Sequence, residues 1–208
     1  TKILPYSFRS MKLNEFVLAG LSDSLIIENN LIRYEFNIQG QLISAFDKAL
    51  KLELIKGVGN VFTLYDDHPN NWDAWDVDFY YRNALVEIAE ATDTMPGSNG
   101  KVVQELNLKF SVGCSSIIQK VKLFPHSKRL DFATKVDWKE KHKMLRVHFS
   151  VNVRAEQATF DIQYGHVQRN THVNTSWDKA KSEVVENKSN VALSQDVLTS
   201  VFRCTGPY

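Results

Sequence analysis

Cysteine is scarce in this sequence, which has two in 208 residues, Cys114 and Cys204. Two cysteines are too few for the disulfide framework of a small secreted domain, and their spacing matches no zinc-binding motif. We therefore expect two free thiols, as is typical of a reducing compartment. A single disulfide between them is the alternative.

Excess charge and long apolar runs are also absent. The 25 basic and 24 acidic residues leave a net charge of +1, so there is no electrostatic reason to expect nucleic acid or an anionic membrane as a partner. No apolar run approaches the ~20 residues that a membrane-spanning helix needs. The sequence starts at Thr1 without an initiator methionine or a signal-like segment. We expect an excised or processed fragment, and processing of a small intact protein is the alternative.

Familiar catalytic motifs are missing as well. The sequence has no Gly-x-Ser-x-Gly motif, no cysteine and histidine at a recognisable spacing, and no glycine-rich phosphate loop. No catalytic nucleophile is therefore predicted in this chain.

What the sequence does have is a regular alternation of apolar and polar residues, which is the pattern of half-buried β-strands. Residues 32–38 alternate in this way, and residues 42–46 resume the pattern after a break at Gly40. This spacing predicts a hairpin whose turn uses Gly40 at positive φ.

Further strands are predicted downstream of this hairpin. The apolar runs cover residues 60–65, 102–110, 117–123, 130–136, 145–153 and 160–164. Val102 is assigned to the apolar face of its run, whereas Arg146 and His148 are assigned to the face opposite the apolar residues. Residues 83–91 fit a helix or a strand, and residues 95–100 predict a turn. Seven or more short strands predict an all-β fold, an antiparallel β-sandwich or a barrel.

The segment after residues 60–65 combines acids with indole rings. Its sequence is Tyr65-Asp66-Asp67-His68-Pro69-Asn70-Asn71-Trp72-Asp73-Ala74-Trp75-Asp76. Carboxylates that bind hydroxyls, placed beside flat apolar rings, are typical of sugar sites. Two alternatives stay open: a surface loop whose acids cap backbone N–H groups, and a Ca²⁺ site, although the spacing fits no EF-hand loop.

Two other polar segments stand out. Residues 164–178 hold His166, His172 and Arg169, side chains that bind hydroxyls or metals, but their spacing is no known zinc motif. The simpler interpretation is a long polar hairpin end. Residues 136–145 are rich in charge and are interpreted as a solvated loop between two strands.

Together, the three segments resemble the C-terminal region of glycoside hydrolase family 38, most nearly its cytosolic and bacterial α-mannosidases. Residues 60–76 are similar to a family run that contains Asp-x-Pro-x-x-Trp/Tyr-Asp-Ala-Trp-Asp. Residues 136–147 are similar to Val-Asp-Trp-x-Glu-x-His-Lys-x-Leu-Lys/Arg-Val, and residues 165–184 to a run that contains Arg-Pro-Thr-His-x-Asn-Thr-Ser-Trp-Asp. The family pattern is not followed at three positions, Asn170, Lys181 and Ser182.

The resemblance implies a division of the chain. Residues 1–21 are a lead-in segment, residues 22–184 are the β-sandwich domain, and residues 185–208 are a tail that lacks the family's next motifs. The implied fold is a galactose-mutarotase-like supersandwich. Whether the tail is diverged or the sandwich is cut short stays open.

The resemblance also implies an activity for the parent protein, the hydrolysis of terminal α-mannosides with retention of configuration. The catalytic carboxylates and a zinc ion are expected on an N-terminal α/β barrel, and a barrel needs more residues than this chain has. The chain is thus interpreted as a noncatalytic domain without a cofactor of its own, located in the cytoplasm. Its expected partners are that barrel and a mannose-containing oligosaccharide.

Within this interpretation, we expect eight side chains to face the barrel or the sugar, because they are aromatic or polar groups in long loops, where function concentrates. They are Tyr65, Asp67, Trp72, Asp73, Asp76, Arg169, His172 and Asn174. Two other interpretations stay open. The chain is an autonomous carbohydrate-binding sandwich with Trp72 and Trp75 as its platform, or a purely structural lobe whose loops dock the barrel.

Overall fold

The computed structural model describes residues 24–71, 77–152, 155–162, 164–178 and 198–202, and most of these residues lie in strands. The elements are β1 (Ser24–Glu28), β2 (Ile32–Asn37), β3 (Leu42–Asp47), β4 (Leu52–Glu53), β5 (Ile55–Asp66), the 3₁₀ helix η1 (Phe79–Asn83), β6 (Leu85–Ile88), β7 (Ala91–Asn99), β8 (Gln104–Val112), β9 (Ser115–Leu123), β10 (Leu130–Asp137), β11 (Lys143–Val151), β12 (Gln157–Ile162), β13 (Gly165–Asn170) and β14 (Leu198–Phe202).

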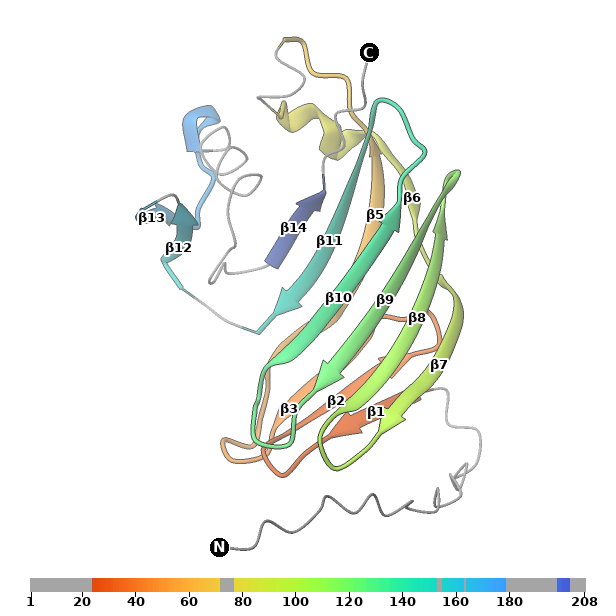
Figure 1. The fold of residues 1–208 in the computed structure, drawn as a ribbon. Coiled ribbons are helices and arrows are strands. Elements are labelled where there is room, and N and C mark those ends of the chain that lie inside the picture. The colour runs from red at the N-terminus through yellow and green to blue at the C-terminus, as the bar shows by residue number, and fades with distance from the viewer. Residues whose placement is uncertain (1–23, 72–76, 153–154, 163, 179–197, 203–208) are drawn as a thin grey trace, which may run out of the picture.

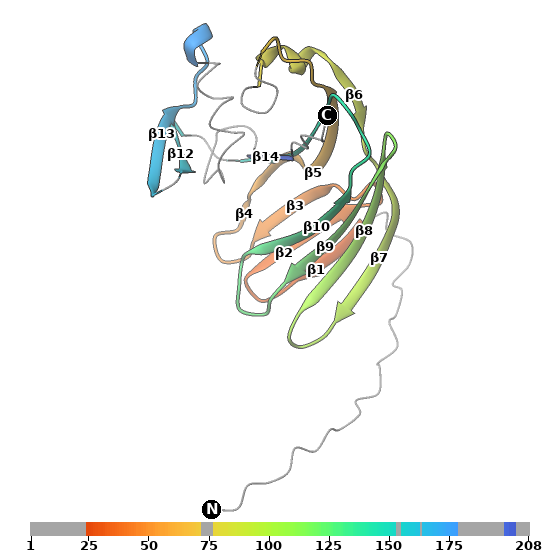
Figure 2. The ribbon, with the colours of Figure 1, turned by 45° about the horizontal axis from the view of Figure 1, so that its top comes forward.

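Two antiparallel sheets pack face to face (Figure 1). In the first sheet the strand order is β1-β2-β3-β5-β11-β14, with β4 beside β3 and β6 beside β5. In the second sheet the order is β10-β9-β8-β7. The hairpin β12–β13 forms a separate pair that stands away from both layers in Figures 1 and 2. The prediction of an all-β antiparallel sandwich is confirmed.

The core lies between the two layers and is built from every second residue of the strands. In β2 the residues at 32, 34 and 36 are buried and those between them are half-buried. In β9 the alternation is sharper, because Ile117 is fully buried between two exposed neighbours, and Gln119 is buried between two exposed neighbours as well. The rings of Phe62 and Phe110 meet edge to face at 5.0 Å across the layers. Burying such side chains stabilises the fold by roughly 1.5–3 kcal/mol each.

A polar link also crosses this apolar core. Asn60 of β5 is 1% exposed, and its Nδ2 donates to Gly40 O at 2.9 Å and to Gln119 Oε1 at 2.8 Å. Gln119 Nε2 in turn donates to Thr134 Oγ1 at 3.1 Å. Gly40 has a φ of 76°, as the sequence predicts, and a Cβ there would lie 2.8 Å from the Phe110 ring. The link therefore ties the β2–β3 turn and the first sheet to the second sheet.

Several local predictions need correction. The turn predicted at residues 95–100 is wrong for residues 95–99, which belong to β7; the turn follows at Gly100, whose N–H donates to Val103 O at 3.1 Å. Proline is tolerated in β7 because β7 is an edge strand. Val102 is 74% exposed and precedes β8, so it does not join the apolar face. Within the ambiguous residues 83–91, η1 ends at Asn83 and residues 85–88 form strand β6, because they pair with β5.

The structure describes one of the two cysteines. Cys114 is an exposed free thiol, and Cys204 lies outside the described residues. Among the described residues no helix has the length and apolar character needed to cross a bilayer.

The link through Asn60 gives a first testable prediction. Asn60→Ala removes two buried hydrogen bonds and places alanine at a φ of 56°. We expect the free energy of unfolding to fall by about 3 kcal/mol in urea titrations. Asn152→Ala removes an exposed side-chain bond to Glu53 O and is the matched control, with an expected loss below about 1 kcal/mol. Equal losses of unfolding free energy for the two variants would show that the buried link stabilises the fold no more than an exposed hydrogen bond does.

Candidate functional site

A second, smaller core lies on the outer face of the first sheet. Tyr65 of β5 is paired with Met144 of β11, so both side chains lie on the face opposite Leu64 and Leu145. Met144 is buried with Val77 and with Tyr81 of η1, and Tyr65 packs against this group. The chain after β5 therefore folds back over the sheet that it has just left.

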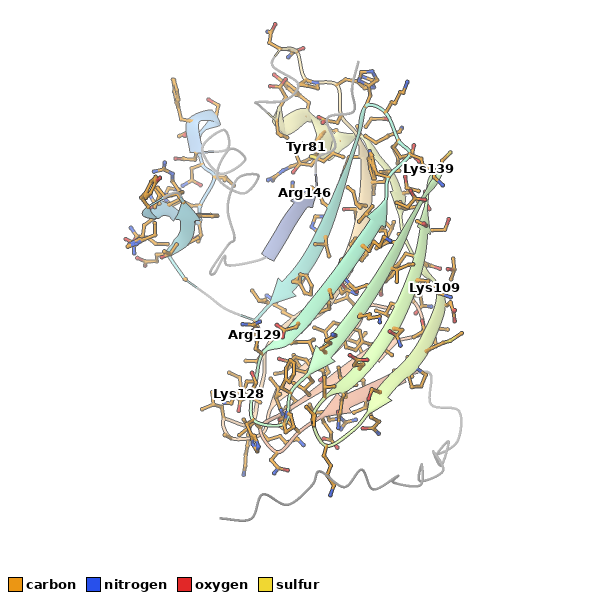
Figure 3. The ribbon with its side chains drawn as sticks, in the orientation of Figure 1. Tyr81, Lys109, Lys128, Arg129, Lys139 and Arg146 are labelled. Atoms are coloured by element: carbon orange, nitrogen blue, oxygen red, sulfur yellow. The ribbon has the colours of Figure 1, made fainter. Side chains whose placement is uncertain are left out.

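The residues that fold back over the sheet bury the side chain of Arg146. Arg146 is 3% exposed, and the centre of its guanidinium group lies 5.0 Å from the centroid of the Tyr81 ring (Figure 3). The Tyr81 ring meets the ring of Tyr65 edge to face at 5.1 Å. Cation–π contacts of this kind gain strength when water is excluded. The alternation places Arg146 correctly on the face away from the main core, but it does not indicate burial, because the covering residues are far away in the sequence.

His148 lies on the same outer face, one alternation further along β11. Its Nε2 is 2.7 Å from Thr63 Oγ1, and its ring is 6.5 Å from that of Tyr65. Burial, with smaller effects of the positive charges of Arg146 and Arg82, lowers the pKa of His148 to about 4. The imidazole is therefore neutral at neutral pH, and it adds no further positive charge to the surroundings of Arg146.

Beside this group, the start of the acid- and indole-rich segment forms a small cavity of about 130 Å³. It is lined by Asp66, Asp67, His68, Pro69, Asp78, Tyr80, Tyr81 and Ala84. Asp67 is 8% exposed, and its N–H donates to His142 O at 2.9 Å. Asp78 Oδ2 accepts the N–H of Asn70 at 2.8 Å, which closes the loop across the cavity. The cavity thus combines carboxylates with tyrosine rings, the groups that bind sugar hydroxyls and sugar C–H faces.

The charges at the rim of the cavity are fixed by a neighbouring strand. Lys143, at the start of β11, forms an ion pair and a hydrogen bond with Asp66. This hydrogen bond lowers the pKa of Asp66, so the carboxylate is ionised at neutral pH. The rings of His68 and His142 stack with centroids 5.2 Å apart. Among the described residues no three His, Cys, Asp or Glu side chains are grouped as a metal site, and part of the acidic segment, residues 72–76, lies outside them.

The sequence-predicted site residues divide into three sets. Tyr65 and Asp67 lie at the outer-face core and in the cavity, as described above. Trp72, Asp73 and Asp76 lie outside the described residues.

The third set lies on the hairpin β12–β13 and the residues after it. Arg169 is half-buried in β13, and its Nε is buried without a hydrogen-bond partner among the described residues. His172 and Asn174 are exposed, and His172 Nδ1 is 4.0 Å from Asp178 Oδ2. Because the hairpin stands away from β5 and η1 in both views (Figures 1 and 2), the structure does not bring this set together with Tyr65 and Asp67.

Comparison with known proteins first defines the class of fold. A crystal structure of an α-mannosidase from Enterococcus faecalis V583 is similar, with a TM-score of 0.59 over 74% of this chain and 20% of that one. Its sequence identity to this chain is 18%, so the likeness shows the fold, a large antiparallel β-sandwich.

The family follows from the sequence. Residues 27–201 match the model of the glycosyl hydrolases family 38 C-terminal domain, and this chain belongs to that family. It is 38% identical over 173 residues to the human protein named alpha-mannosidase 2C1, covering 81% of this chain. It is 35% identical over 175 residues to alpha-mannosidase G of Dictyostelium discoideum, covering 80% of this chain. The chain spans 17% and 16% of the lengths of these two relatives. The match runs past residue 184, and β14 also lies within residues 185–208; the predicted domain boundaries stay predictions.

The depressed pKa of His148 predicts a pH dependence of stability. Between about pH 6.5 and about pH 4 the unfolded chain binds a proton at His148 and the folded chain does not, so the free energy of unfolding falls as pH falls through this window. We expect His148→Gln to remove on the order of 2 kcal/mol of this loss, after allowance for partial exposure of the ring. Urea titrations of both proteins at several pH values in this window measure the difference.

The comparison at equal pH cancels the protonation of carboxylates such as Asp66, which are present in both proteins. If the two stability curves stay parallel from neutral pH to about pH 4, His148 titrates normally and its neutral, buried state is disproved.

Proposed function

We propose that this chain is the noncatalytic C-terminal β domain of a retaining, zinc-dependent α-mannosidase that removes terminal α-mannosides in the cytoplasm. The observation that carries the proposal is the family match over residues 27–201, together with relatives that are named α-mannosidases. In the proposed parent, a separate catalytic domain supplies the two carboxylates of the retaining mechanism. Zinc, bound by that domain, would stabilise charge that develops on sugar oxygens.

The role proposed for this chain is to complete the sugar-binding cleft from outside the catalytic domain. In the cavity, Asp67 and Asp78 are positioned to accept hydrogen bonds from hydroxyls, and Tyr80, which is 55% exposed, offers an apolar face. The pairing of Asp66 with Lys143 holds the rim in one charge state. Arg146 and Tyr65 both contact the ring of Tyr81, which lines the cavity, and so hold this part of the wall in place. A rigid wall of this kind restricts the orientations of a bound sugar without taking part in bond cleavage.

In a protein that carries the catalytic domain, Asp67→Asn tests this role of the cavity. Arg169→Ala tests a separate sugar-facing role for β13, which does not line the cavity. We expect Asp67→Asn and Arg169→Ala each to lower kcat/KM for an α-mannoside by about tenfold, which corresponds to the loss of one hydrogen bond to a substrate. Asp93→Asn, on the edge strand β7 and remote from both segments, is the matched control and should leave kcat/KM unchanged. Unchanged kcat/KM for Asp67→Asn and Arg169→Ala, in folded protein, would refute a sugar-facing role for both.

The isolated chain gives a second test. We expect no hydrolysis of an aryl α-mannoside by the 208-residue chain, since none of its residues is assigned a catalytic role. Turnover by a clean preparation would contradict the proposed location of the catalytic groups. Calorimetric titration with mannose or mannobiose separates the alternatives, because measurable binding by the isolated chain would favour an autonomous carbohydrate-binding module.

A further inference from the structure

The two layers of the sandwich differ in width. The first sheet continues past β5 to β11 and then β14, whereas the second sheet ends at β10. The ring centroids of Phe132 in β10 and Phe149 in β11 are 5.3 Å apart, so β10 lies over β11. Among the described strands, none of the second layer is paired with the outer edge of β10 or placed beyond it over β14.

The burial of paired residues shows that the sandwich is open at this edge. The core-facing residues of β9 are at most 2% exposed, whereas the residues of β10 paired with them are half-buried. The pairs are Ile117 with Val136, Gln119 with Thr134, Val121 with Phe132 and Leu123 with Leu130. On β11 the same trend appears, because Leu145 and Val147 are buried but Phe149 and Val151 are not fully covered.

Between the layers, this open edge gives access to an apolar cavity of about 440 Å³. Its walls come from both sheets and include Leu42, Phe62, Phe132, Val147, Phe149 and Val151. Such a cavity left in water forgoes much of the stabilisation that burial of its lining would give. Something apolar is therefore expected to cover it.

The chemistry of the edge favours a polypeptide strand as the cover. In an edge strand, alternate residues direct their N–H and C=O groups away from the sheet, which is a template for another strand. Lys128 and Arg129 are the cations among the residues that line the cavity (Figure 3). They form ion pairs with Asp47 and Asp131, so their positive charges are already neutralised and do not favour an acidic small molecule. A strand would satisfy the backbone of β10 and place every second side chain in the cavity.

We propose that a β-strand from polypeptide outside this chain, in the longer protein of which it forms a part, pairs with β10 and closes the sandwich over β11 and β14. Its core-facing residues are apolar and alternate with polar ones. The inference rests on the proposed function, because that function places the chain in a longer polypeptide. In the relatives, about five sixths of the polypeptide lies outside the matched part, as their coverage of 17% and 16% implies.

Hydrogen exchange at β10 tests the proposal. In the isolated chain we expect protection to alternate along residues 130–137, because every second amide points away from β9. In the longer polypeptide, measured as a monomer, we expect all amides of β10 to be protected, with those that point outward slowed at least tenfold. Val136→Glu in the longer polypeptide should restore the alternation, whereas Lys135→Glu, an exposed neighbour on the opposite face, should not.

Three outcomes would overturn the proposal. Alternating protection in the longer polypeptide would mean that the edge is open there too. Full protection that appears in the isolated chain only at high concentration would identify a second copy as the occupant, and full protection at every concentration would identify the chain's own residues.

If Val136→Glu unfolds the domain, seen as lost protection in β8 and β9, Val136→Ser replaces it. An active mannosidase with an open β10 edge would refute this inference and leave the proposed function intact.

Discussion

The register of β5 against β11 is the constraint on which the rest of the structure depends. It pairs Leu64 with Leu145 on the inner face and Tyr65 with Met144 on the outer face. A slip of one residue would turn the two leucines to the outside and carry the outer-face residues, including Arg146, into the apolar core. The cost of burying an unpaired guanidinium there makes such a slip prohibitive.

The same register links the core to the proposed site. The hydrogen bonds from Asn60 to Gly40 and Gln119 fix β5 against both the neighbouring turn and the opposite sheet. At its other end, β5 places Tyr65 on the outer face and ends at Asp66, which is paired with Lys143 of β11 and forms an ion pair with it. The position of the acid-rich cavity is thus set by packing inside the sandwich. Loops held in this way by a rigid scaffold are where binding residues concentrate.

Much of this arrangement can be predicted from the sequence, because strand alternation is a local property. The two-residue period predicts the strands β2, β3 and β8 to β12, and Gly40 predicts the turn between β2 and β3. What could not be predicted depends on contacts between distant segments. The burial of Arg146 requires η1 to fold over β11, and the inclusion of Pro96 in a strand requires the edge position of β7. The separation of Arg169 from Tyr65 is likewise a matter of tertiary structure, which spacing along the chain does not encode.

We propose that the cavity beside Tyr81 faces the bound sugar in the longer protein. The most direct measurement is a crystal structure of the longer polypeptide, with its catalytic domain, bound to a non-hydrolysable α-mannoside. We expect the cavity to open into the cleft that holds the sugar, with the Asp67 or Asp78 carboxylate within hydrogen-bond distance of a hydroxyl, directly or through one water. A cavity that opens to bulk solvent on a face remote from the bound mannoside would contradict it.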